Sequence, residues 1–343
     1  MPLTPSPRRR RAAVALLAGA LPVLVAGCGV STADDDADTL RVYSARTYGA
    51  EQAYERFTED TGIEVSFLNG SDAELRERLE AEGADTAADV FMTTDVANLS
   101  LAAEQGLFAP LDSPELEAAV PASLRDPQDR WFALSVRARA LLFNTDEVDA
   151  GELSGYESLA DPRWKGRLCL RGSSSSYTQS LVASFIAHEG PERARAIVDG
   201  WMANDPQVFN NDNEVVRTIA EGGCDVGITN HYYVARQVAE DPEFPVGIVW
   251  PQEPHGVHVN ISGAGVTEHA DNPDLAETFL EWLATEGQSL FVDGNFEYPV
   301  NRSVEPVEVL DGLGDFERDE LNVGELGRYN AEAVQLLTDA GYR

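Results

Sequence analysis

The sequence predicts an α/β protein built from two lobes with a ligand cleft between them. Short apolar strands alternate with amphipathic helices along most of the chain, a pattern typical of α/β lobes with largely parallel sheets. Residues 28–343 are also too many for one ordinary core. Two long extended runs, at 131–144 and 256–266, have the length needed to cross from one lobe to the other.

The first lobe begins with strand–helix units. β-Branched and aromatic residues alternate in segments that predict strands at 40–44, 63–67 and 89–93. Amphipathic spacing predicts helices at about 49–60, 72–82 and 98–105, and Thr61-Gly62 closes the first of these. The second lobe has strands at 167–170 and 225–229 and helices at 178–188 and 192–204, and two further helices, 273–286 and 325–340, finish the chain. We therefore expect lobe 1 at 40–135 and 262–305, and lobe 2 at 136–261 and 306–343.

The N-terminus reads as an export signal rather than as part of the fold. Four arginines at 8–11 precede a short apolar stretch, and the stretch ends in Val25-Ala26-Gly27-Cys28. A small-residue site that ends in cysteine resembles a bacterial lipobox, which predicts cleavage before Cys28 and lipidation of its thiol. The acidic segment 29–39 is then a flexible tether. The chain is expected outside the cytoplasm, attached to the outer face of the cell membrane by lipid alone.

The charge balance limits the kinds of partner. The whole chain has 25 basic and 59 acidic residues, and the signal holds four of the basic residues and none of the acidic ones. Such a surface argues against nucleic-acid binding, which requires Lys and Arg against phosphates. It also argues against capture of an anion by long-range attraction. An acidic excess spread along the whole chain is typical of solubility in high salt.

Tyrosines follow three predicted strands, each at the expected start of a helix. Tyr48 follows strand 40–44, Tyr177 follows strand 167–170, and the pair Tyr232-Tyr233 follows strand 225–229. Ligands of open α/β sheets bind beyond the carboxyl ends of the strands. A phenol ionises near neutral pH only with strong help, because its ordinary pKa is about 10, and a hard trivalent cation supplies that help. Four phenols at one cleft suit Fe(III). The alternative is that these tyrosines only pack against the core.

Several segments resemble the ferric-iron-binding solute receptors of bacterial ABC importers. The resemblance lies in the segments Arg171–Ser184, Thr229–Tyr233, Gly256–Val266 and Gly294–Asn301, and it extends over nearly all of 40–343. It implies a periplasmic-binding-protein fold, Fe(III) as the cargo, and permease and ATPase subunits as partners. It also implies that Tyr48, Tyr177, Tyr232 and Tyr233 are the ligands. Some relatives use His and Glu in the first lobe, where this chain has Thr47 and Thr94, so it resembles the tyrosine-rich subtype.

Charge balance gives two arginines of the first crossing strand a role. Four phenolates around Fe(III) leave one net negative charge, which is costly in a poorly solvated cleft. Arg137 and Arg139 are two residues apart and share one face of the strand, so both are candidates to compensate this charge. The alternative is that they are surface arginines paired with acidic groups.

Two cysteines remain besides Cys28. Thiols of an exported protein are usually paired, so Cys169 and Cys224 are expected to form a disulfide between the Tyr177 and Tyr232 segments.

Other functions have weaker support. The sequence contains no nucleophile elbow, no zinc-protease motif and no phosphate loop, which argues against an enzyme. The protein is expected to be a monomer. The second hypothesis is a receptor of the same fold for an organic or oxyanion solute, with Ser173 to Ser176 offering backbone N–H groups.

Overall fold

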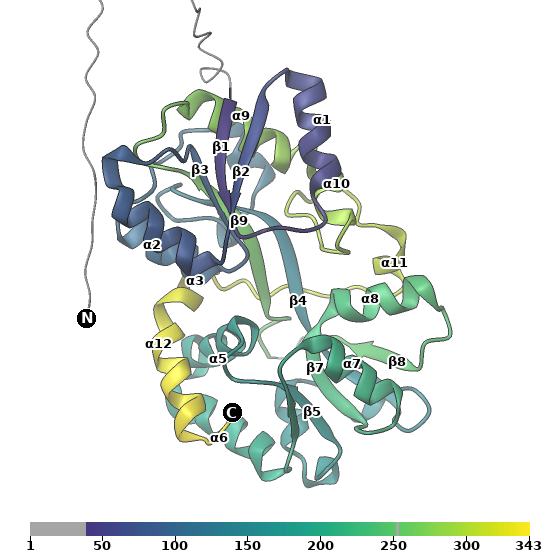
Figure 1. The fold of residues 1–343 in the computed structure, drawn as a ribbon. Helices are drawn as coiled ribbons and strands as arrows, with labels where there is room; N and C mark the ends of the chain where they lie inside the picture. The colour runs from purple at the N-terminus through teal and green to yellow at the C-terminus, as the bar shows by residue number, and fades with distance from the viewer. Residues whose placement is uncertain (1–38, 252–253) are drawn as a thin grey trace, which may run out of the picture. The chain divides into compact units, whose positions relative to one another are not determined.

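The computed structural model describes residues 39–251 and 254–343, and Figure 1 shows how their helices and strands are arranged. The predicted signal at 1–28, its lipidated Cys28 and most of the predicted tether at 29–39 lie outside the described residues. Strand β1 already begins at Thr39. Among the described residues, no helix combines the length and the apolar character that a membrane span requires.

The strands of the described residues form one mixed sheet of nine. Their order is β2-β1-β3-β9-β4-β7-β5-β6, and β8 pairs with β4 beside this path. The strands are β1 (Thr39–Ser44), β2 (Glu64–Asn69), β3 (Val90–Thr93), β4 (Phe132–Asn144), β5 (Leu168–Arg171), β6 (Gln207–Phe209), β7 (Val226–Asn230), β8 (Val246–Val249) and β9 (Val259–Val266). We call β1, β2 and β3 the β1 side of the sheet and β5, β6 and β7 the β7 side.

The two predicted crossing strands are confirmed as strands and lie in the middle of the sheet. β4 has all 13 residues buried, and it pairs with β9 on one edge and with β7 and β8 further along. These central pairings are antiparallel, as is β3 with β9. Parallel pairs occur only on the two sides, between β1 and β2, β1 and β3, β5 and β6, and β5 and β7. The expectation of largely parallel sheets therefore holds for the sides but not for the centre.

Helices cover the sheet, and most begin and end near the predicted residues. They are α1 (Glu51–Thr61), α2 (Asp72–Glu82), α3 (Val96–Glu104), α4 (Pro114–Ala119), α5 (Ser176–Glu189), α6 (Pro191–Ala203), α7 (Asp212–Ala220), α8 (His231–Glu240), α9 (Pro273–Ala284), α10 (Gln288–Asp293), α11 (Glu308–Asp311) and α12 (Gly324–Asp339). α4, α7, α10 and α11 were not predicted. All are short, at 6, 9, 6 and 4 residues, so their apolar periodicity covers few turns.

Local chemistry explains several helix ends. α1 stops at Gly62, which has φ +76° and donates its N–H to the Thr58 carbonyl, as a left-handed C-terminal residue does. α2 begins after Ser71, whose hydroxyl accepts from the Glu74 N–H, and α3 begins after Asp95, whose carboxylate accepts from the Ala97 N–H. The Ser71 and Asp95 caps fix where the chain passes from β2 and β3 into the following helices.

The C-terminal helix touches helices from both sides of the sheet. α12 packs against α5, which follows β5, and against α3, which follows β3 (Figure 1). Three of its buried residues, Ala333, Leu336 and Leu337, belong to the same apolar cluster as much of α5 and α6, whereas the fourth, Leu326, belongs to the cluster that contains α3. The lobe boundaries that place 306–343 with lobe 2 remain a prediction.

The Cys169–Cys224 disulfide is present in the structure. Cys169 lies in β5 and Cys224 lies two residues before β7, with their Cα atoms 5.8 Å apart. Both residues are buried. Because β5 and β7 are neighbouring parallel strands, the disulfide holds together the two strands that lead to Tyr177 and Tyr232.

We predict that a Cys169→Ala/Cys224→Ala variant loses about 4 kcal/mol of unfolding free energy, since the bond closes a long loop in the unfolded chain. The two residues are separated by 55 positions. Urea unfolding of parent and variant measures the loss, and parent treated with a thiol reductant is the control. An unchanged unfolding midpoint, or two titratable thiols in the unfolded, unreduced protein without Cys28, would contradict the prediction.

Candidate metal centre

The adjacent tyrosines lie in the first turn of α8, as the sequence predicts. Strand β7 ends at Asn230 and the helix begins at His231, so Tyr232 and Tyr233 leave the carboxyl end of a central strand. Tyr232 is buried and Tyr233 is half-buried, and their ring centroids are 4.3 Å apart. Two phenols are thus held side by side where a helix N-terminus favours negative charge.

His231 anchors this turn and is not placed as a ligand. It is fully buried, its Nδ1 accepts from the Ala138 N–H at 3.2 Å, and its Nε2 lies 2.8 Å from the Phe296 carbonyl. Both ring nitrogens are therefore occupied by backbone groups. Burial lowers the pKa of His231 to about 4, so its neutral form suits this site.

Tyr177 meets the pair from the neighbouring strand. It is the second residue of α5, and its backbone N–H donates to the hydroxyl of the cap residue Ser175. The Tyr232 hydroxyl lies 3.3 Å from the Tyr177 hydroxyl. The junctions after β5 and β7 therefore bring three phenols together.

Tyr48 reaches the same region from the β1 side, but not from a helix. The expectation that it stands in a first helical turn is wrong, because α1 begins only at Glu51, after the cap residue Ala50. Gly49, with φ +66°, separates Tyr48 from the helix in a conformation that few other residues adopt. Tyr48 interacts electrostatically with Tyr177 and Arg137, which places it near the other phenols.

Burial keeps three of the phenols protonated when no metal is present. It raises the pKa of Tyr232 well above the ordinary value, raises that of Tyr233 to about 12, and raises that of Tyr48. Arg137 acts in the opposite direction on Tyr48 and Tyr232. A bound cation must therefore displace a proton from each phenol that it uses.

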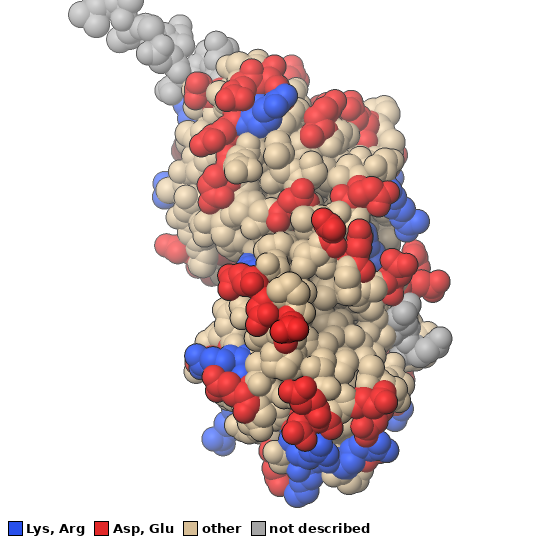
Figure 2. Space-filling view, turned by 90° about the vertical axis from the view of Figure 1, so that its right-hand side faces the viewer, with Lys and Arg blue, Asp and Glu red and all other residues tan. Residues whose placement is uncertain are grey.

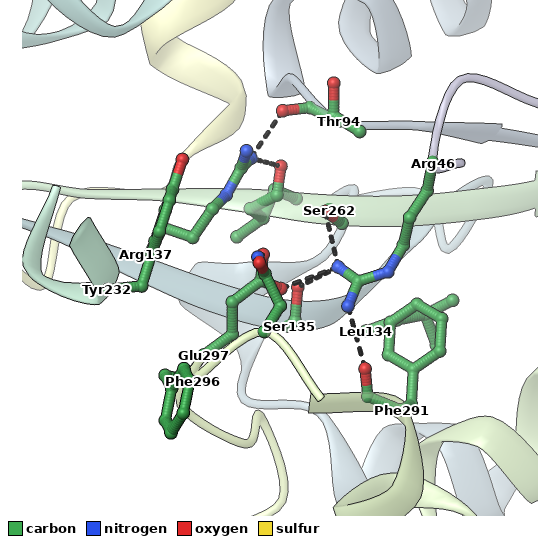
Figure 3. Close-up of polar contacts among 12 residues, drawn as sticks. Arg46, Thr94, Leu134, Ser135, Arg137, Tyr232, Ser262, Phe291, Phe296 and Glu297 are labelled. Carbon is green, nitrogen blue, oxygen red and sulfur yellow. Dashed lines mark hydrogen bonds and ion pairs between the residues drawn. The ribbon is translucent and has the colours of Figure 1, made fainter. Parts of the chain in front are cut away.

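Arg137 holds a buried positive charge beside these phenols. Its side chain is almost fully buried, and its Nη2 donates to the carbonyls of Thr94 and Ile261 (Figure 3). Nε and Nη1 have no hydrogen-bond partner. The guanidinium lies 5.6 Å from the Tyr177 ring centroid. Burial lowers the pKa of Arg137, but the surrounding phenols and Glu297 raise it by more, so the group stays charged.

Arg139 has a carboxylate partner, Asp212, which it shares with Arg171. It donates to Asp212 at 2.8 Å and to the Asn230 side-chain oxygen at 3.2 Å, and both Arg139 and Asp212 are buried. Its guanidinium is 5.8 Å from the Tyr177 ring centroid. The two arginines therefore face the same phenol, yet only Arg137 lacks a direct ion pair.

Sequence reasoning missed three polar residues next to the tyrosines. Glu297 is fully buried and pairs with Arg46, Asn295 is also buried, and Arg236 lies over the rings of Tyr232 and Tyr233. Arg236 was detectable, because it stands four residues after Tyr232 on the same helix face. Glu297 gave no such signal, since a carboxylate in a loop is usually exposed.

No other metal site competes with the tyrosines in the part of the chain that the structure describes. It contains no group of three or more His, Cys, Asp or Glu residues placed to hold a metal ion. Thr94, which stands where some relatives have Glu, donates its hydroxyl to Asp72 at 3.0 Å.

Comparison with known proteins identifies the family of this chain. Residues 85–313 match the family model described as "Bacterial extracellular solute-binding protein". The chain is 38% identical to iron uptake protein A1 of Synechocystis sp. over 93% of each protein. It is 40% identical to a Trichodesmium protein solved with iron and citrate ligands, with a TM-score of 0.83 over 89% of this chain and 100% of that one. The ferric binding protein of Campylobacter jejuni is 33% identical, with a TM-score of 0.81, over 89% of this chain and 100% of its own. The chain therefore belongs to the family of bacterial extracellular solute-binding proteins.

Proposed function

We propose that this protein is an extracytoplasmic receptor that binds ferric iron and delivers it to the permease and ATPase subunits of an ABC importer. Tyr48, Tyr177, Tyr232 and Tyr233 bind the ion as phenolates. The observation that carries the proposal is the contact between the Tyr177 and Tyr232 hydroxyls, 3.3 Å apart, beside the buried guanidinium of Arg137. The names of the relatives, which include iron uptake and ferric binding proteins, support the same cargo.

Charge balance favours a trivalent ion at this centre. Four phenolates and Fe(III) together carry one net negative charge, and the unpaired Arg137 supplies one positive charge. A divalent ion in the same site leaves an additional negative charge that Arg137 alone does not balance. Arg139 pairs with Asp212, and Asp212 also lies within 3.6 Å of Arg171.

The alternative receptor, for an organic or oxyanion solute, has less support. Phenols with raised pKa values are poor partners for an organic cation, since they carry no charge until a metal binds. Citrate in the Trichodesmium structure accompanies iron rather than replacing it. We therefore treat an anion as a companion of the metal and not as the cargo.

We predict that a Tyr232→Phe/Tyr233→Phe variant binds ferric iron more than about 100-fold more weakly, because even outer partners of metal ligands are worth about 10- to 100-fold. Competition with a chelator, followed through the visible phenolate-to-iron band, measures the affinity. Tyr298→Phe is the matched control, since Tyr298 is a buried tyrosine whose hydroxyl has no partner. If the double variant keeps the affinity and the visible band of the parent, the site lies elsewhere.

Acid should discharge the iron. Each phenol that leaves the metal regains a proton, and burial raises the pKa of Tyr48, Tyr232 and Tyr233, so falling pH favours release. We expect the visible band to disappear between pH of about 8 and about 4, with more than one proton taken up per iron. Reduction to Fe(II) should release the ion at a higher pH, because the less charged ion competes poorly with protons. A band that persists unchanged over this pH range would contradict phenolate ligation.

We further propose that the receptor is a monomer, exported and anchored through a lipid on Cys28. The sequence before the folded body supports this, since Val25-Ala26-Gly27-Cys28 resembles a lipobox. A Cys28→Ser variant should lose incorporation of labelled fatty acid in cells and leave the membrane fraction, while its purified form binds iron like the parent. Unchanged labelling of the variant would refute the anchor.

A further inference from the structure

A chain of buried polar side chains joins the loop of Tyr48 to the helix of Tyr232 and Tyr233. It starts at Arg46, whose Nη1 donates to Glu297 Oε2 at 2.6 Å (Figure 3), and both side chains are fully buried. Arg46 also donates to Ser262 Oγ at 3.1 Å and to the Phe291 carbonyl at 2.7 Å. The Arg46 guanidinium lies 5.4 Å from the Tyr48 ring centroid.

Asn295 is the middle of this chain. Its Nδ2 donates to Glu297 Oε1 at 2.5 Å, and its Oδ1 accepts from Arg236 Nη2. Arg236 stands on α8, with its guanidinium 5.0 Å from the Tyr232 ring centroid and 5.6 Å from that of Tyr233. The polar chain therefore begins beside Tyr48 and ends over the tyrosine pair.

The chemistry of each group explains why an amide occupies position 295. An ionised carboxylate only accepts hydrogen bonds and a guanidinium only donates them. Burial raises the pKa of Glu297, but Arg46 and Arg137 lower it by more, so this carboxyl stays ionised. A side chain between Glu297 and Arg236 must therefore donate with one end and accept with the other. Asn295 does both, which fixes its amide orientation and the position of the Arg236 guanidinium.

Backbone packing holds the two loops together at the same place. A Cβ on Gly294 would lie 2.6 Å from the Gly49 carbonyl oxygen, so the loops approach as closely as two glycines allow. Gly49 follows Tyr48 directly, and Gly294 precedes Asn295. The two loops are therefore in direct backbone contact beside Tyr48 and Asn295.

We propose that Asn295 and Glu297 are positioning residues that hold the Arg236 cation over Tyr232 and Tyr233 and couple it to the Tyr48 loop. This inference rests on the proposed function, because it concerns phenolates that bind iron. A cation fixed above two phenolates stabilises their negative charge and lowers the energy of their donor electrons. It therefore moves the phenolate-to-iron band to shorter wavelength and slows replacement of iron by protons.

The test compares Asn295→Ala with the parent and with Asn301→Ala, using iron supplied as ferric citrate. Asn301 is the matched control, since its side chain bonds to the Ala284 carbonyl and the Ser303 N–H instead. We expect Asn295→Ala to shift the visible band to longer wavelength, to release iron to a competing chelator several-fold faster, and to discharge it at higher pH. Asn301→Ala should match the parent in all three. The position of the visible band distinguishes a positioning role of Asn295 from a merely structural one.

A second variant keeps the inference testable if Asn295→Ala folds poorly. Arg236 is half-buried on α8, and Arg236→Gln should give the same band shift and the same faster release. The double variant should resemble Arg236→Gln alone, because residues that act through one another are not additive.

The outcomes test the polar chain and iron binding separately. Parent-like behaviour of Asn295→Ala, or additive effects in the double variant, overturns the polar chain while iron binding stands. A parent protein without any visible band on addition of ferric citrate overturns the proposed function itself, and the role of Asn295 with it.

Discussion

The buried charge of Arg137 constrains the rest of the site. A guanidinium that is almost fully buried, with Nε and Nη1 unpartnered, is costly unless negative charge comes close to it. The groups around it are phenols that burial keeps neutral in the absence of metal, and the carboxylate of Glu297, which already pairs with Arg46. Phenolates formed by a hard cation would supply the missing negative charge. The positive charge of Arg137 and the negative charge of the phenolates therefore balance only when the arginine, the phenols and a trivalent ion are all present.

The sheet explains how these groups meet. β4 crosses the middle of the sheet and pairs with both β9 and β7, so its Arg137 and Arg139 lie between the β1 side and the β7 side. β5 and β7 are parallel neighbours joined through Cys169 and Cys224, which aligns their carboxyl ends. Tyr177 and Tyr232 leave those ends and reach contact distance. Tyr48 follows β1 and so comes from the β1 side of the sheet. The polar chain through Glu297 links its loop to the same centre.

Surface and interior use charge in opposite ways. Acidic side chains are spread over the face in Figure 2 and outnumber basic ones there, in agreement with a formal net charge of −34. The interior near the tyrosines instead contains arginines: Arg46, Arg137 and Arg139 are all buried. Buried guanidinium groups keep their charge, because their pKa is far above neutral and each can make several fixed hydrogen bonds. The acidic surface suits solubility, whereas the buried arginines place positive charge close to the phenols.

The sequence by itself determined most of the strands, the longer helices and the chemistry of the junctions, because these depend on local periodicity and on residue type. It predicted both crossing strands, the start of α8 before Tyr232 and a pairing of Cys169 with Cys224 that the structure contains. It did not predict the antiparallel centre of the sheet, the loop position of Tyr48, the short strands β6 and β8 or the short helices α4, α7, α10 and α11. Only the tertiary structure decided that Arg139 pairs with Asp212 while Arg137 has no ion-pair partner. It alone also placed Glu297 and Asn295 next to the tyrosines. Those contacts join residues from 2 to more than 250 positions apart in the chain. Arg46 and Glu297, for example, are separated by 251 positions. No local sequence pattern encodes a pairing over a separation of that size.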